Sequence, residues 1–237
     1  MINIGFERIE PVPNYPDGTS AATLSGLTWS SGTNQVSSFK VGIKKALRKS
    51  QFARCCFCRR LMYHDYATHI EHFVDKGGYP AYTFEIRNLA LSCGTCNTNK
   101  NGYFSTWAKR FSKRYMIRGI PYNAYCPVLK NQILGNVNFP TSSAEFRWVN
   151  PYVHNYSEHI EIKKGWFFHG KTPEGKRTIR GVKLNDVGVV EKRALSERLE
   201  ARGGKLSMLV GALGELEQHR ARDVVEVVVA AIKRRRQ

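Results

Sequence analysis

Apolar residues recur at helical spacing in two basic segments of the first half of the chain. Residues 38–54, SFKVGIKKALRKSQFAR, place hydrophobic side chains between lysines and arginines with a period that predicts a helix. Residues 103–119, YFSTWAKRFSKRYMIRG, combine aromatic and basic residues with the same period. Residues 1–38 are rich in Ser, Thr, Gly, Asn and Pro, and they predict a loop-rich N-terminal arm.

The pattern changes in the second half. Residues 119–145 are turn-rich and predict a connection, whereas HIEIKKGWFFHGKT alternates around KKG and predicts a β-hairpin. From Asp186 onward the spacing is helical, with a break at Gly203-Gly204. The chain is therefore expected to be an α+β protein in four parts, with boundaries at 1–38, 39–118, 119–185 and 186–237.

Charge is concentrated where the pattern is most distinctive. The 237 residues carry 37 Lys+Arg against 19 Asp+Glu, a net charge of +18. Residues 39–118 alone contribute +12 of it. A concentrated positive field attracts polyanions, and nucleic acid is the commonest of these. A merely solubilising surface is the alternative.

The chain contains no apolar run of the roughly 20 residues that a membrane-spanning helix needs, and its start has no secretory signal pattern. We therefore expect a cytoplasmic protein without a membrane partner. Its six cysteines should then be reduced, and metal ligands or core residues rather than disulfides.

Four of the cysteines form two CxxC pairs, Cys55/Cys58 and Cys93/Cys96. Together they offer four sulfurs, the tetrahedral set of a structural Zn²⁺ site. Cys56 and Cys126 are left over, and we expect them to pack in the core. A zinc ion bound in this way would tie together the two ends of the 34 residues between the pairs.

Those residues contain HIEH, at positions 69–72. Glu71 offers a hard oxygen ligand beside the imidazole of His72, and Asn97 offers an amide oxygen after the second pair. These oxygens, with water and phosphate, suit Mg²⁺ or Mn²⁺. A histidine beside such a metal can take a proton from water, which makes the set chemically complete for phosphodiester hydrolysis.

The order of these motifs resembles the HNH endonuclease family, which has a zinc-stapled ββα-metal fold. The motifs are Cys-x2-Cys, Glu-His, Asn-Leu and Cys-x2-Cys-Asn-x2-Lys. The resemblance implies that His72 is the general base, that Glu71 (more often Asp in the family) and Asn97 bind the catalytic metal, and that Asn88 braces the hairpin loop. His69 lies on the same strand face as Glu71 and is either a metal or phosphate contact or a structural histidine.

A narrower resemblance covers roughly residues 48–195. HIEHF, YPAYTFEIRNLALSCGTCNTNK and VNPYVHNYSEHIEI are similar to the HNH subunits of Septu-type and retron-associated antiphage systems. It implies a partner ATPase and a role in antiviral defence. The Arg-Pro-Lys that usually follows the motif is here VDK, so only Lys76 is retained.

The sequence thus predicts a metal-dependent endonuclease that acts on nucleic acid, DNA before RNA. An RNase with the same site and a non-catalytic zinc module that binds nucleic acid are the alternatives. His154 and His159 lack the spacing of metal ligands, and we interpret them as packing or surface residues. The cations expected to contact phosphates are Arg59, Arg60, Lys76, Lys100, Lys109, Arg110, Lys113 and Arg114.

Overall fold

A computed structural model describes residues 3–63, 65–116, 126–132 and 138–189, without the side chains of Ala67 and of residues 108–116. This part of the chain is α+β, with small antiparallel sheets between helices, as the pattern predicts. Most of the segment predicted to be helical at 186–237 lies outside the described residues.

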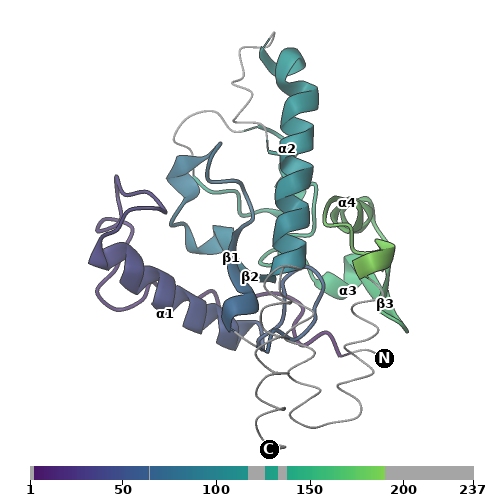
Figure 1. Ribbon diagram of the computed structural model, residues 1–237, viewed down its shortest axis with the longest axis horizontal. Coiled ribbons are helices and arrows are strands. Elements are labelled where there is room, and N and C mark those ends of the chain that lie inside the picture. Colours follow the sequence, from purple (N-terminus) through teal and green to yellow (C-terminus); the bar gives the residue numbers. More distant parts are fainter. Residues whose placement is uncertain (1–2, 64, 117–125, 133–137, 190–237) are drawn as a thin grey trace, which may run out of the picture.

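The centre of the fold is a hairpin followed by a helix (Figure 1). Strand β1 (Thr68–His72) pairs antiparallel with β2 (Leu89–Cys93), and His72 lies opposite Leu89. Helix α2 (Gly94–Met116) begins directly after β2 and packs on both strands. All five residues of β2 are buried, so this strand is covered on both faces.

Helix α1 (Asn34–Ser50) begins and ends four residues before the predicted limits. Thr33 accounts for the early start, because its hydroxyl accepts the Val36 N–H as an N-cap. The helix therefore crosses residue 38, the position at which the sequence predicted the end of the N-terminal arm. Val36, Phe39, Ile43 and Leu47 form its buried stripe, and α1 contacts β2.

The second hairpin is confirmed, as β3 (Ile160–Lys163) paired with β4 (Phe167–Gly170). Helices α3 (Tyr156–His159) and α4 (Pro173–Gly181) flank it and were not predicted. Thr172 caps α4 and Pro173 follows it, a sequence signature of a helix start that identifies α4. Gly181 lets α4 approach Trp148, because a Cβ there would lie 2.1 Å from the indole ring.

Short 3-10 turns join these elements: η1 (Asp65–Ala67), η2 (Pro80–Tyr82), η3 (Ile86–Asn88) and η5 (Ser143–Glu145). The N-terminal arm is loop, as expected, but it contributes to the core. Ile9 is fully buried, and its N–H donates to the Pro151 carbonyl at 2.8 Å. The arm is therefore an integral part of the fold.

Candidate functional site

The two CxxC pairs meet in the structure. One sulfur from each of Cys55, Cys58, Cys93 and Cys96 lies within 4.8 Å of the others, and all four residues are buried. The Sγ atoms of Cys58 and Cys93 are 3.9 Å apart. These four thiols could hold a metal ion such as zinc. Cys56 and Cys126 are buried outside this cluster, as expected for core residues.

The first pair sits on a tight turn that Arg59 completes. The Arg59 N–H donates to the Cys55 carbonyl at 3.0 Å, and its φ of 61° lies in the left-handed region that a non-glycine residue rarely adopts. Its guanidinium lies over the rings of Phe6 (3.6 Å) and Tyr156 (4.2 Å), and burial lowers its pKa to about 10. These two cation–π contacts favour this backbone conformation.

Arg59 is fully buried and therefore presents no surface to a phosphate, contrary to the prediction from sequence. Arg60 is also buried, and its carbonyl accepts the Cys55 N–H. Both arginines belong to the scaffold of the cysteine cluster.

His72 ends β1 and is held by the loop that joins the two strands. Its Nε2 lies 3.0 Å from the Thr83 carbonyl oxygen. A carbonyl only accepts, so Nε2 carries the proton and the lone pair of the neutral ring is on Nδ1. Burial, followed by the charge of Lys76, lowers the pKa of His72 to about 3. At neutral pH the ring is therefore uncharged, with its proton on Nε2 and its lone pair on Nδ1.

Asn88 braces the loop that supplies this carbonyl. Its Oδ1 accepts the Val74 N–H at 2.7 Å, and its Nδ2 donates to the carbonyls of Val74 (3.0 Å) and Tyr82 (2.9 Å). Tyr82 directly precedes Thr83, so the amide of Asn88 fixes the peptide next to the acceptor of His72. These bonds tie both ends of the loop to Asn88, the position at which the resemblance implied a brace.

Glu71 points away from His72, into the interface with α2. Its carboxylate forms an ion pair with Lys100, and both side chains are 2% exposed. Lys100 also donates to the His72 carbonyl at 2.8 Å and lies over the Phe104 ring. Lys100 is therefore an internal cation and not the surface phosphate contact that was predicted.

This arrangement does not fit a divalent cation at Glu71. Mg²⁺ retains several waters when bound by carboxylates, and the buried Glu71 carboxylate is already neutralised by Lys100. Burial raises the pKa of Glu71, and Lys100 only partly opposes this effect. Asn97 lies half-buried on the first turn of α2, three residues before Lys100.

The other predicted residues are dispersed. Lys76 is half-buried in the loop after His72, and its charge acts on the His72 ring. His69 is exposed at the start of β1, opposite Ser92. Four predicted phosphate contacts fall in α2 at positions whose side chains lie outside the described part: Lys109, Arg110, Lys113 and Arg114.

Sequence reasoning missed three residues around His72. Thr83 supplies a carbonyl, which no side-chain pattern can reveal. The Trp29 ring meets the His72 ring edge-to-face at 4.5 Å, and the Lys40 ammonium lies over Trp29 at 5.0 Å. Trp29 comes from the N-terminal arm, so only its aromatic character within a polar, turn-rich stretch distinguishes it.

Comparison with family models, with curated proteins and with solved structures found no match to this chain. Within the described residues, none of the helices has the length and apolar character needed to cross a bilayer.

Proposed function

We propose that this protein is an endonuclease that hydrolyses nucleic-acid phosphodiesters, DNA before RNA, with His72 as the general base and a structural zinc on the four cysteines. The observation that carries the proposal is the His72–Thr83 hydrogen bond, which leaves Nδ1 as the acceptor on the first strand of a hairpin–helix unit. General bases act by accepting a proton at a fixed position, and this ring is fixed.

In the proposed reaction, a water molecule gives one proton to Nδ1 of His72 while its oxygen attacks phosphorus. The new P–O bond forms as the bond to the leaving sugar oxygen breaks, and that oxygen takes a proton from solvent. Lys76 and Lys40, whose charges act on the His72 ring, would stabilise the added negative charge on the phosphate.

The Mg²⁺ or Mn²⁺ predicted at Glu71 and Asn97 stays a prediction. Glu71 can bind such an ion only if Lys100 leaves its carboxylate, so no step above depends on it. The predicted partner ATPase and defence role rest on the sequence resemblance alone.

The test is cleavage by the purified protein. Plasmid, linear duplex, single-stranded DNA and tRNA are offered side by side with Mg²⁺, Mn²⁺ or EDTA. We expect His72→Ala to abolish cutting, whereas His169→Ala, at an exposed histidine of β4, leaves it unchanged. Circular dichroism and zinc content establish that each variant is folded. Equal cutting by His72→Ala would refute the assignment of the base.

A zinc module that binds nucleic acid without cutting it is the second candidate. The observation in its favour is that His72 is only 6% exposed and lies beneath Trp29. Tight binding by the wild type and by His72→Ala, with no cleavage of any substrate under any metal condition, would favour this candidate.

A further inference from the structure

A pocket of about 530 Å³ opens beside His72 and has no part in the reaction described above. The N-terminal arm forms one wall and residues 80–85 form the other. Thr28 and Phe84 line the pocket, and their chain neighbours Trp29 and Thr83 are two of the residues that contact the His72 ring. A ligand in this pocket would therefore lie next to the proposed reaction centre.

The chemistry of the lining favours a flat, largely apolar ligand. Leu24 (2% exposed) and Phe84 (8% exposed) are buried, and the Tyr15 hydroxyl is fixed by donating to the Phe84 carbonyl at 3.1 Å. Aromatic rings and aliphatic side chains in a groove of this size are typical surroundings of a stacked nucleobase.

The charge of the lining excludes a phosphate from the pocket itself. Of the residues that line it, only Glu85 carries a charge, and that charge is negative. The cations Lys40 and Lys76 act instead on the His72 ring. Charge complementarity therefore places the phosphate of a bound strand at His72 and a base of the same strand in the pocket.

Glu85 is held so that it can select among bases. Its Oε1 accepts the Arg87 N–H at 3.1 Å, which fixes the carboxylate at the start of η3. A carboxylate only accepts hydrogen bonds. Guanine presents two adjacent N–H donors on its pairing edge, at N1 and at the 2-amino group. Adenine, cytosine and thymine each place an acceptor beside their donor on that edge, and the acceptor would face the carboxylate.

We propose that this pocket binds one unpaired guanine of the strand whose phosphate is presented to His72, and that Glu85 selects guanine. The proposal rests on the proposed function and makes the substrate a strand with an exposed guanine, because a paired base hides this edge in the duplex. Glu85 is thus a specificity residue, and Phe84 and Tyr15 form part of the surface against which the base packs.

The experiment measures binding and not cleavage, so it tests the pocket separately from the proposed role of His72 as general base. The His72→Ala protein is titrated into fluorescein-labelled single-stranded DNA of about 12 nucleotides at fixed salt, and fluorescence anisotropy gives Kd. The strands differ at one central base, which is guanine, inosine (guanine without its 2-amino group) or adenine. We expect guanine to bind about tenfold more tightly than inosine, as for one hydrogen bond to a charged group.

Two variants test the pocket. Glu85→Gln keeps the acceptor for Arg87 but replaces the other oxygen with a donor, and we expect it to remove the preference for guanine. Ala81→Trp fills the pocket from an exposed wall position and should also remove the preference, while the affinity for the adenine strand changes little. Ala144→Trp, at an exposed position that lines a different pocket, is the matched control and should retain the preference.

Equal affinities for guanine and inosine strands, or a preference that survives in both pocket variants, would overturn the proposal. If no strand is bound, both this proposal and the proposed function fail. If the guanine preference depends on the pocket but the protein cuts no substrate, the pocket stands and the catalytic proposal falls.

Discussion

Glu71 and His72 are adjacent in the sequence, yet the structure gives them opposite environments. Successive side chains of a strand point to opposite faces, so one residue faces α2 and the other faces the loop and the N-terminal arm. Glu71 is neutralised by Lys100, and His72 is held by Thr83 beneath Trp29. The motif that the sequence predicted to be one metal site is, in this structure, an internal ion pair beside a histidine held by a backbone carbonyl.

The Glu71–Lys100 pair gives a prediction about stability. Removing one partner of a buried ion pair leaves an uncompensated charge, which costs about 3–5 kcal/mol, whereas replacing both is far less costly. We expect Lys100→Met to lower the free energy of unfolding by about this amount, and Glu71→Gln/Lys100→Met to restore most of it, both measured by urea denaturation.

The matched control is the pair Lys130–Glu174 nearer the surface, whose side chains are 41% and 18% exposed and whose charged atoms are 3.6 Å apart. Lys130→Met should cost no more than about 1 kcal/mol, because exposed pairs contribute little. If Lys100→Met costs no more than Lys130→Met, Lys100 does not neutralise a buried charge.

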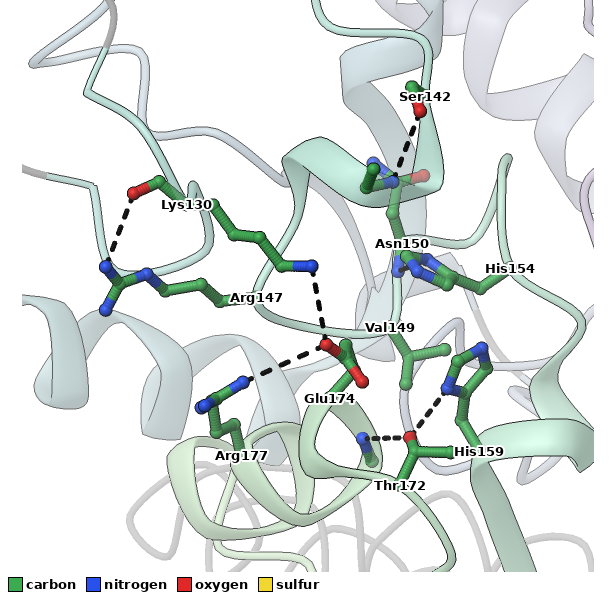
Figure 2. A network of polar contacts seen from close by, with 12 residues as sticks. Lys130, Ser142, Arg147, Val149, Asn150, His154, His159, Thr172, Glu174 and Arg177 are labelled. Carbon is green, nitrogen blue, oxygen red and sulfur yellow. Dashed lines mark hydrogen bonds and ion pairs between the residues drawn. The ribbon is translucent and has the colours of Figure 1, made fainter.

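His154 gives a prediction about pH (Figure 2). Its ring is 5% exposed, its Nδ1 accepts the Asn150 N–H at 3.0 Å, and its ring meets that of His159 edge-to-face at 4.7 Å. Burial, then repulsion by His159 and Lys130, lowers the pKa of His154 to about 4, although Glu174 acts to raise it. The interpretation of His154 as a packing residue is confirmed.

In the unfolded chain this ring takes up a proton near its ordinary pKa of 6.5, whereas in the folded protein its pKa is about 4. The free energy of unfolding therefore falls as the pH drops from about 6.5 to about 4. The slope is at most about 1.4 kcal/mol per pH unit. We expect His154→Gln to unfold with a weaker pH dependence than the wild type between pH 7 and pH 4, by urea denaturation at each pH. Parallel curves for the two proteins would contradict the lowered pKa.

At the scale of elements, the N-terminal arm is the part whose role the sequence did not reveal. Trp29 packs against Phe39 of α1, Phe84 of the loop and the His72 ring. The arm therefore both forms one wall of the pocket and packs against the proposed base, which is only 6% exposed.

If Trp29 covers His72, removing its ring should expose the base. We expect Trp29→Ala to raise the initial cleavage rate roughly three- to tenfold, a change of about 1 kcal/mol in the barrier. Trp29→Phe, which retains a ring at this position, should stay near the wild-type rate. A slower Trp29→Ala enzyme with intact circular dichroism would mean that Trp29 positions the base and does not cover it.

Local patterns predicted the elements that depend on local signals. Period-two alternation identified the second hairpin, and the CxxC spacing predicted the cysteine cluster. The pairing of Glu71 with Lys100 and the burial of Arg59 could not be predicted in the same way. They depend on contacts between residues 29 and more positions apart, such as Arg59 with Tyr156. Long-range contacts thus account for the burial of Arg59 and Lys100, two of the three expected phosphate contacts that the structure places in the interior.

At the scale of the whole molecule, segments from distant parts of the chain enclose the cysteine cluster. The rings of Phe6 and Tyr156 both contact the Arg59 guanidinium, and the Tyr156 hydroxyl donates to the Phe57 carbonyl at 2.8 Å. Because the cluster joins the first CxxC turn to the start of α2, a metal bound there would tie both to the hairpin.

We therefore expect the purified protein to contain one equivalent of zinc and to lose its cooperative unfolding transition when a strong chelator removes it. Structural zinc supplies folding free energy directly, because the unfolded chain offers no preformed site. Cys96→Ser should have the same effect, whereas Cys126→Ala, at a buried cysteine outside the cluster, should retain the metal. Metal analysis and thermal unfolding are the measurements, and a Cys96→Ser protein with full zinc content would exclude the cluster as its site.

The contact between Tyr156 and the Phe57 turn also sets the order of events during biosynthesis. The two residues are 99 positions apart. Ribosomes add about 5–20 residues per second, so the turn waits roughly 5 to 20 s for its closing tyrosine. A nascent chain therefore cannot complete this scaffold while it is still short.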